Sequence, residues 1–374
     1  MEQKVFRQNE LDKLKKVLSN YKPENIFLVR GNNSFQTSGA EQFIKDILGC
    51  SDINSFYDFS SNPKIEDLKK GIEIFQRKNH DLIIAIGGGS VIDMGKLISV
   101  LAHQKADIER IVSGKEKIET PKTKLLAIPT TAGSGAEATR FAVLYINNIK
   151  YSVKHTFIQP DFVFLSSKFN LPENTYTAAC SGVDAFCQAV ESVWSVKANQ
   201  ESEQYALLAA ELMWNNLQKA IFEKDEIARE KIQEASFLSG KAINISETTA
   251  PHALSYAFTS FYNIPHGHAV ALSLPFFMNY NYNINDENCA DKRGANHVKE
   301  KINKLLKIFN VESIHAQTAI ESFFNSVGIN IRILTLVDNF DSRVIINNIN
   351  FDRLNNNPRI ISEKTILEFL EDSK

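Results

Sequence analysis

The chain has 374 residues, which is long enough for two domains or one large one. Hydrophobic residues make up 43% of it and charged residues 23%, a composition that excludes a disordered or collagen-like chain. Lysine and arginine total 42 against 44 aspartate and glutamate residues, and the resulting formal charge of -2 argues against nucleic acid as the main partner.

The four cysteines are scattered without a CxxC pair, so we expect no disulfide framework and favour a reducing compartment. The first twenty residues are polar and lack the apolar core of a signal peptide. No stretch reaches the roughly 18 apolar residues that a membrane-spanning helix needs. We therefore expect a cytoplasmic protein without a membrane partner.

Short apolar runs alternate with amphipathic segments in the first half of the chain. We expect strands at residues 25–29, 55–59, 81–86, 125–128 and 162–165, and helices at residues 38–48 and 65–78. Continuous apolar strands separated by helices indicate a parallel sheet that is covered on both faces. This βα alternation is typical of a dinucleotide-binding α/β domain.

Long helical stretches dominate from about Thr175 onward, and we expect no strong strand there. Helices are expected at residues 175–194, 200–222, 225–243, 250–261, 298–309 and 315–327. The change of pattern near residues 168–174 predicts one domain over residues 1–172 and a second over residues 173–374. The Asn-rich segments 279–291 and 347–358 are expected to be surface loops.

The motif AIGGGSVIDMGK joins a buried strand to a helix. Its turn consists of Gly87, Gly88, Gly89 and Ser90. Glycines let the backbone approach a phosphate closely, and a helix N-terminus offers free N–H groups and a partial positive charge. The motif therefore predicts a phosphate-binding loop, with a tight turn without a ligand as the alternative. Asp93 is expected to cap or hold this loop, and Lys96 is interpreted as a solvated helix residue.

The motif IPTTAGSGAEATR follows the next expected strand. It places the hydroxyl groups of Thr130, Thr131 and Ser134 after the carboxyl end of that strand, where α/β sheets bind ligands. We expect these side chains to contact the same ligand, and a Thr/Gly-rich surface turn is the alternative.

A possible metal site is spread over the second half of the chain. Asp184 and Gln188 lie four residues apart and share one face of a helix. His252 begins a later helix, and His266 follows in IPHGH. One carboxylate and two imidazoles suit a borderline divalent ion such as Zn²⁺ or Fe²⁺, to which Gln188 could add an amide oxygen. A structural role for each histidine is the alternative.

The motifs GGGSVIDMGK, PTTAGSGAEAT and DAFCQAVES, followed by His252 and IPHG, resemble in order and spacing the iron-containing (group III) alcohol dehydrogenase family. The resemblance covers about residues 25–277. It implies a Rossmann-like N-terminal domain with NAD(P) on the glycine loop, and an all-helical C-terminal domain whose metal holds the substrate oxygen. It further implies an NAD(P)-linked alcohol dehydrogenase or aldehyde reductase that acts on a small molecule and forms a homo-oligomer such as a dimer. Lys154 is expected among the cofactor-binding residues.

Two positions depart from the family pattern around the metal. Gln188 stands where many members have a histidine, and Tyr256 stands where a second histidine often falls. The metal is therefore expected to be Fe²⁺ or Zn²⁺ on Asp184, His252 and His266, and loss of the metal is the alternative. Tyr256, His268 or a water relay through the cofactor ribose are the candidate proton donors.

The nucleotide preference is predicted from the end of the first of the expected strands. Many NAD-specific members have an aspartate there, but this chain has Gly31, followed by Asn32 and close to Arg30 and Ser34. Without the carboxylate, a 2′-phosphate is not repelled and these neighbours can donate hydrogen bonds to it. We expect NADP(H) rather than NAD(H), with a loop that accepts both as the alternative.

The segments SGVDAFCQAVESVWSV, INISETTAPHALSY, IPHGHAVAL and RLNNNPR resemble the phosphonoacetaldehyde reductase branch of the family, which forms 2-hydroxyethylphosphonate. Such a dianionic substrate needs cationic and hydroxyl partners, and we expect Lys241 and Arg140 first. The other candidates are Lys154, His155, Thr248, Thr249 and His268. A generic short-chain alcohol or polyol dehydrogenase is one alternative. A sugar-phosphate cyclase of the dehydroquinate synthase type and an inactive binding protein are the others, and Asp184 and PTTAGSG argue against the cyclase.

Overall fold

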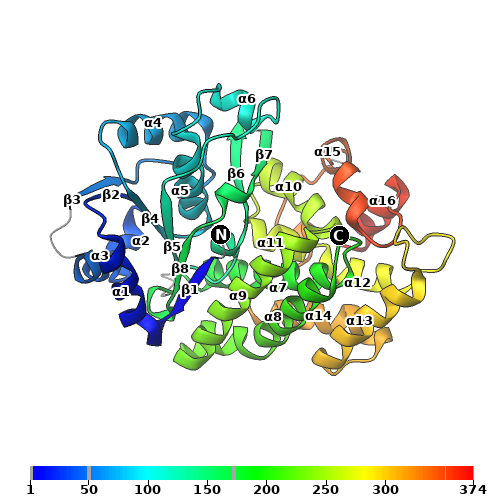
Figure 1. Cartoon of the computed structure of the whole chain (residues 1–374). Coiled ribbons are helices and arrows are strands. Elements are labelled where there is room, and N and C mark those ends of the chain that lie inside the picture. Colours follow the sequence, from blue (N-terminus) through cyan, green and yellow to red (C-terminus); the bar gives the residue numbers. More distant parts are fainter. Residues whose placement is uncertain (1–2, 49–51, 148, 171–173, 350, 374) are drawn as a thin grey trace. The chain divides into compact units, whose positions relative to one another are not determined.

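A computed structural model describes residues 3–48, 52–147, 149–170, 174–349 and 351–373. The chain divides into two compact units, Met1–Leu171 and Pro172–Lys374. The ribbon in Figure 1 is blue to green-cyan over the first unit and green to red over the second.

The N-terminal unit is built on a six-stranded parallel sheet with the strand order β1-β8-β5-β4-β2-β3. Its strands are β1 (Lys4–Arg7), β2 (Asn25–Arg30), β3 (Asp52–Phe56), β4 (Leu82–Gly87), β5 (Lys124–Pro129) and β8 (Phe162–Leu165). The central strand β4 is buried along its whole length, which explains its continuous apolar sequence. The expected parallel sheet is confirmed.

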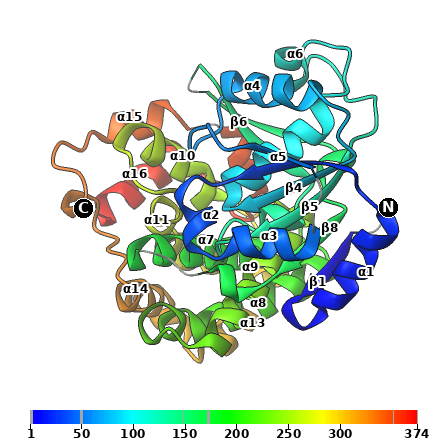
Figure 2. The same cartoon turned by 90° about the vertical axis from the view of Figure 1, so that its left-hand side faces the viewer.

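Helices cover both faces of this sheet. They are α1 (Leu11–Tyr21), α2 (Asn33–Thr37), α3 (Ala40–Leu48), α4 (Ile65–Gln76), α5 (Gly89–Leu101) and α6 (Ile108–Val112). Phe27 and Val29 of β2 pack in one cluster with α4 and α5, while Ile26 and Leu28 pack in another with α1 and α3. This alternation follows from the two-residue period of a strand. Figure 1 shows α4 above strands β2 and β4 and α3 below them, and Figure 2 shows α4 and α3 from the left-hand side of that view.

Two parts of this unit contain strands that are not among the expected ones. The short strand β1 pairs with β8 at the edge of the sheet. An antiparallel hairpin of β6 (Phe141–Ile146) and β7 (Ile149–Lys154) packs its buried side chains into the cluster formed with α4 and α5. Both elements extend the α/β unit beyond the strands expected from the sequence.

The strand order shows where the chain changes the side of the sheet on which it adds successive strands. From β2 onward the chain builds β3 on one side of β2 and then β4, β5 and β8 in turn on the other side. In open α/β sheets a ligand binds outside the carboxyl ends of the strands at such a reversal, here between β2 and β4. Gly31 and Asn32 follow β2, and Gly88 follows β4.

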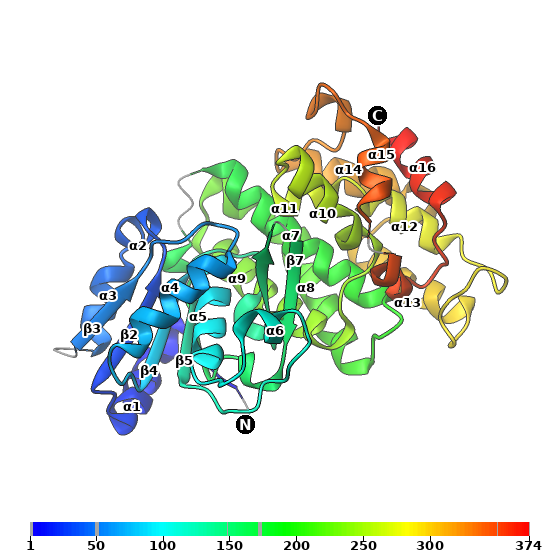
Figure 3. The same ribbon diagram turned by 90° about the horizontal axis from the view of Figure 1, so that it is seen from above.

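The C-terminal unit is helical, and no strand forms among its described residues. Its main helices are α7 (Thr175–Trp194), α8 (Gln200–Gln218), α9 (Glu226–Ser246), α10 (Ala250–Tyr262), α11 (His266–Ala271), α12 (Leu274–Tyr282), α13 (Ala295–Phe309), α14 (Ala316–Ser326), α15 (Ser342–Asn347) and α16 (Glu363–Asp372). Helix α7 packs against α8, α9 and α11, and Figure 3 shows α11 beside it. None of the described helices combines the length and apolar character needed to cross a membrane.

The segment 347–358 differs from the expected surface loop. Residues Phe351–Asn356 form a 3₁₀ helix, η8, and the side chains of Asn356 and Asn357 are buried. The segment is polar because its amide groups are used in internal hydrogen bonds, such as the pair between Asn357 and Asn281. The other Asn-rich segment begins as a helix, since α12 extends to Tyr282.

Candidate functional site

The glycine loop and the threonine-rich loop lie against each other in the N-terminal unit. Gly88 is the last residue before α5, and the Gly87 carbonyl accepts a 3.0 Å hydrogen bond from the Thr130 N–H. A Cβ on Gly89 would lie 2.5 Å from Ser134 Oγ, whereas a Cβ on Gly88 would meet only the Thr131 side chain, at 3.6 Å. A side chain at Gly89 would therefore displace Ser134, while Gly88 leaves its backbone accessible from the other side.

These contacts bring the expected cofactor residues to one edge of the sheet. Gly87, Gly88, Gly89 and Ser90 neighbour Thr130, Thr131 and Ser134 at the carboxyl ends of β4 and β5. The first N–H groups of α5 lie in the same loop, which suits a phosphate. The donor chemistry of this edge therefore fits a dinucleotide.

Asp93 and Lys96 on α5 bind the segment 136–143, which follows the threonine-rich loop, rather than facing solvent. Asp93 accepts a 2.9 Å hydrogen bond from the Val143 N–H of β6. Lys96 is fully buried, so its interpretation as a solvated residue is wrong. Its ammonium donates to the carbonyl groups of Ala136 (2.7 Å) and Phe141 (2.6 Å) and to Thr139 Oγ1 (2.9 Å). Three oxygens converging on one ammonium explain why a lysine is stable in this interior.

The residues expected to contact the ribose lie at the end of β2 and directly after it. The Arg30 guanidinium lies 3.9 Å from the Tyr57 ring centroid and donates to the Gly31 carbonyl at 3.1 Å. Asn32 is exposed, and the Ser34 side chain lies outside the described residues. Lys154, also exposed, ends β7 and pairs in register with Phe141.

Three of the four expected metal ligands meet in the C-terminal unit. Asp184 on α7, His252 on α10 and His266 on α11 each offer one ligand atom, and these atoms lie within 4.8 Å of one another. His252 Nε2 lies 3.2 Å and His266 Nε2 lies 3.9 Å from Asp184 Oδ1. The Asp184 and His252 side chains are buried, whereas the His266 side chain is 35% exposed. One carboxylate and two imidazoles therefore form a centre that suits a borderline divalent ion and is open on one side.

A buried carboxylate orients His252. Glu191, two turns after Asp184 on α7, contacts His252 Nδ1 and accepts from the Thr249 N–H at 2.7 Å and the Thr249 hydroxyl at 2.8 Å. Burial opposes a charge on His252, but the Glu191 and Asp184 carboxylates outweigh it and raise the pKa of His252 to about 10. A carboxylate on the second nitrogen leaves Nε2 directed at Asp184, as in metal-ligating histidines.

Gln188 contacts the cluster through its amide nitrogen. Nε2 donates to Asp184 Oδ2 at 3.2 Å, and Oε1 accepts from the Ser239 hydroxyl at 3.1 Å. The Ser239 hydroxyl on α9, which also lies 2.8 Å from the Ser236 carbonyl, thus contacts the amide oxygen, the atom that a metal would need. In this arrangement Gln188 orients Asp184.

Close packing fixes the position of His266. A Cβ on Gly267 would lie 1.9 Å from the Cys180 carbonyl oxygen, so only glycine allows α11 to approach α7 this closely. The Tyr256 ring lies nearly parallel to the His266 ring, with a 6° angle and 5.7 Å between centroids. Tyr256, a candidate proton donor, is therefore adjacent to the cluster.

His268, the other candidate proton donor, has partners on both ring nitrogens. Nε2 contacts the Asn330 carbonyl, and Nδ1 lies 2.7 Å from the Tyr176 hydroxyl. Since a carbonyl only accepts, Nε2 carries the proton and Nδ1 accepts from Tyr176. Burial lowers the pKa of His268, which keeps the ring neutral. These contacts give His268 a role in packing α11.

Sequence reasoning missed Glu191 and Arg353. Glu191 lies seven residues after Asp184 on the same helix face, and a carboxylate in an apolar helix was the available signal. The guanidinium carbon of Arg353 lies 4.7 Å from the Tyr256 ring centroid, a contact between positions far apart in the sequence. No local sequence pattern indicates that Arg353 lies beside Tyr256.

Comparison with known proteins agrees with this geometry. Residues 2–167 match the iron-containing alcohol dehydrogenase family, and residues 178–374 match the C-terminal part of the Fe-containing alcohol dehydrogenase family. A phosphonoacetaldehyde reductase from Streptomyces viridochromogenes is 30% identical over 298 residues, which are 76% of this chain and 74% of that protein. A 1,3-propanediol dehydrogenase from Citrobacter freundii is 33% identical over 245 residues, which are 64% of this chain and 62% of that protein.

Solved structures show the same fold. Sulfoacetaldehyde reductase from Bifidobacterium kashiwanohense, in complex with NAD⁺, has a TM-score of 0.86 at 23% identity and covers 99% of this chain and 96% of its own. A 1,3-propanediol oxidoreductase has a TM-score of 0.84 at 24% identity and covers 99% and 98%.

Taken with the two units, these findings define an NAD(P)-dependent oxidoreductase with a metal-binding helical domain. The chain belongs to the iron-containing alcohol dehydrogenase family, as its motifs predict. It is an alcohol dehydrogenase or aldehyde reductase, and the family implies small alcohols or aldehydes as substrates.

Proposed function

We propose that this protein reduces a small anionic aldehyde, phosphonoacetaldehyde, to 2-hydroxyethylphosphonate with NADPH. The observation that carries the proposal is the convergence of Asp184, His252 and His266, with His252 oriented by Glu191. Its substrate rests on the 30% identity to a phosphonoacetaldehyde reductase over most of both chains. A generic short-chain alcohol or polyol dehydrogenase of the same family is the alternative.

In this proposal the C-terminal unit binds the metal and the N-terminal unit binds the nucleotide. When bound, a divalent ion supplies Lewis-acid polarisation and a nicotinamide supplies the hydride. Asp184, His252 and His266 would hold the ion, whether Fe²⁺ or Zn²⁺, and Gln188 would orient Asp184. The Tyr256 hydroxyl is the candidate that holds or passes on the proton gained by the product oxygen.

The N-terminal unit would hold the nucleotide. The loops after β4 and β5 would contact the pyrophosphate, with the contribution of Lys154 expected from the resemblance. Gly31 leaves the ribose side without a carboxylate, which favours NADPH because a 2′-phosphate is not repelled. We further propose a cytoplasmic homo-oligomer, such as a dimer.

A substrate panel tests the proposal. The protein is loaded with Fe²⁺ or Zn²⁺ and assayed with phosphonoacetaldehyde and propanal, each with NADPH and with NADH. We expect a much higher kcat/KM for the phosphonate, because binding energy from its anionic group helps to position the carbonyl. Asp184→Ala should lose both bound metal and activity while it still binds nucleotide. Equal kcat/KM values for the two aldehydes would leave the generic alcohol dehydrogenase.

A further inference from the structure

An arginine lies beside the proposed metal centre. The guanidinium carbon of Arg353, on η8, lies 4.7 Å from the centroid of the Tyr256 ring. That ring in turn lies 5.7 Å from the His266 ring, centroid to centroid. These two distances limit the separation between the guanidinium carbon and the His266 ring centroid to about 10 Å. Arg353 thus brings a permanent positive charge close to the centre.

The hydrogen-bond donors of Arg353 are not used within the chain. Among the residues that the structure describes, no hydrogen bond or ion pair engages its guanidinium, and its contact is the face of Tyr256. Arg293 differs, since it donates to Asp291 and to the Ser195 and Ala198 carbonyls. Arg359 also differs, since it donates to the Tyr280 carbonyl at 2.7 Å. A half-buried arginine with five N–H groups available is suited to a ligand anion.

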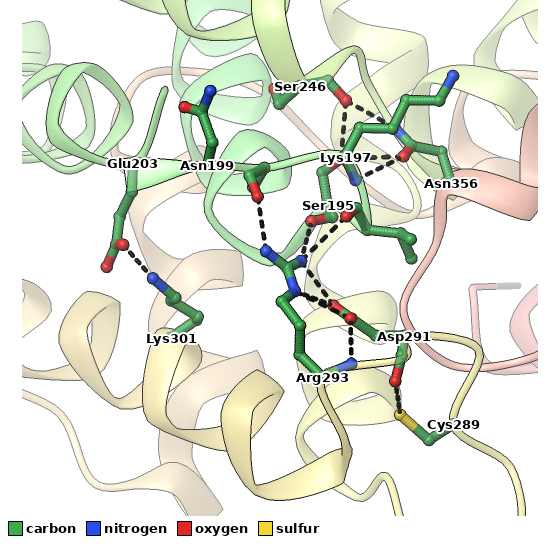
Figure 4. A network of polar contacts seen from close by, with 12 residues as sticks. Ser195, Lys197, Asn199, Glu203, Ser246, Cys289, Asp291, Arg293, Lys301 and Asn356 are labelled. Atoms are coloured by element: carbon green, nitrogen blue, oxygen red, sulfur yellow. Dashed lines mark hydrogen bonds and ion pairs between the residues drawn. The ribbon is translucent and has the colours of Figure 1, made fainter. Parts of the chain in front are cut away.

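The segment that carries Arg353 is firmly held. Asn356, three residues later on η8, donates to the Ser246 carbonyl at 2.9 Å and the Thr248 carbonyl at 2.8 Å. Its amide oxygen accepts from the Ser195 hydroxyl at 3.0 Å and the Lys197 N–H at 3.2 Å. Figure 4 shows the bonds that join Asn356 to Ser246, Ser195 and Lys197. Thr249 donates to Glu191, which contacts His252. The adjacent residues Thr248 and Thr249 therefore support both the 3₁₀ helix that carries Arg353 and the orientation of His252.

We propose that Arg353 binds the anionic group of the substrate. The inference rests on the proposed function and names the residue that selects an anionic aldehyde. In a two-carbon aldehyde with a terminal phosphonate, three bonds separate the carbonyl oxygen from phosphorus, roughly 4 Å when extended. Adding about 2 Å from metal to oxygen and about 3 Å for N–H···O contacts gives a reach of roughly 9 Å, which is comparable with the upper limit of about 10 Å between the His266 ring and the guanidinium. Lys241, expected from the sequence, lies against the Tyr205 ring at 4.6 Å instead.

The test compares Arg353→Gln with Arg343→Gln. Arg343 is a matched control because it is an exposed arginine of the same unit, paired with Asp341. Metal-loaded protein is assayed with phosphonoacetaldehyde and with propanal. Charge-assisted hydrogen bonds predict that R353Q lowers the ratio of the two kcat/KM values by roughly 10- to 100-fold, mainly through KM for the phosphonate. Arg343→Gln should leave this ratio unchanged.

A binding measurement accompanies the kinetics. Calorimetric titration with 2-hydroxyethylphosphonate should show a similar loss of affinity in R353Q, while bound metal stays at the wild-type level. Arg353→Lys keeps the charge but not the planar guanidinium. Its affinity for 2-hydroxyethylphosphonate should therefore lie between those of the wild type and R353Q. A wild-type ratio or wild-type affinity in R353Q would overturn the inference, as would equal losses on both aldehydes. If wild-type protein itself shows no preference for the phosphonate, the proposed substrate fails, and the inference fails with it.

Discussion

Replacement of Glu191 by glutamine tests the proposed metal centre through a residue that does not belong to the ligand cluster. The Glu191 carboxylate is fully buried and accepts two hydrogen bonds from Thr249, and it contacts His252 Nδ1. Glutamine keeps the length of the side chain but has one acceptor oxygen and one NH₂ donor. Either Thr249 or His252 must therefore face a donor, and the negative charge beside His252 is lost.

The expected loss is one of metal affinity. Replacing a carboxylate that orients a ligating histidine typically weakens metal binding by roughly 10- to 100-fold. This corresponds to about 1.4 to 2.7 kcal/mol. Competition with a chromophoric chelator measures the dissociation constant for Zn²⁺ and, under anaerobic conditions, for Fe²⁺.

Glu203→Gln is the matched control. Glu203 is also a buried glutamate of the helical unit, but it pairs with Lys301 and Lys304. Its replacement should lower the free energy of unfolding without changing the metal dissociation constant. An unchanged dissociation constant in Glu191→Gln would refute the view that Glu191 orients His252 for a metal.

Three further predictions concern the nucleotide and the metal. Gly88→Ala should weaken NADPH binding, measured by fluorescence titration, far more than it lowers the melting temperature, because its Cβ meets only Thr131 at 3.6 Å. Gly31→Asp should shift the ratio of kcat/KM values toward NADH by on the order of tenfold, measured with both cofactors. The raised pKa of His252, about 10, means that a metal must displace its proton. Chelator competition should therefore show metal affinity rising about tenfold per pH unit between about pH 7 and 9.

Each of these has a contrasting result. Gly89→Ala is the control for the first, since its Cβ would collide with Ser134 Oγ and should lower stability as well. Nucleotide binding that is unaffected in Gly88→Ala would contradict the placement of the pyrophosphate. A wild-type enzyme strongly selective for NADH would show that Gly31 has been misread. A metal affinity independent of pH would mean that metal binding does not displace a proton from His252.

The sequence predicts the elements whose pattern is local. Strands β4 and β8 and helix α7 are recognisable because continuous apolar runs and helical periodicity act over neighbouring residues. Strand β1 is only four residues long and lies at the edge of the sheet, so its sequence, KVFR, lacks a continuous apolar run. Strand β6 of the hairpin is itself a continuous apolar run, FAVLYI, that the sequence makes visible, whereas its partner β7, IKYSVK, mixes apolar and polar residues.

Parts of the candidate site depend on contacts that only the folded chain creates. Asp184 and Gln188 share a helix face by spacing, but the hydrogen bond from Ser239 that engages the Gln188 oxygen comes from another helix. Likewise, the contact of Arg353 with Tyr256 joins η8 to α10. Residue types and order predict the centre, whereas the orientation of each side chain requires tertiary structure.

The buried ammonium of Lys96 has a consequence for the mobility of the cofactor edge. It joins the Ala136 and Phe141 carbonyls to α5. If the segment after the threonine-rich loop separated from the sheet, the Lys96 ammonium would lose these hydrogen-bond acceptors at the same time. Such a segment opens as one cooperative unit instead of fraying residue by residue. The chain therefore stiffens this edge from within, and a nucleotide that binds there loses less freedom in ordering it.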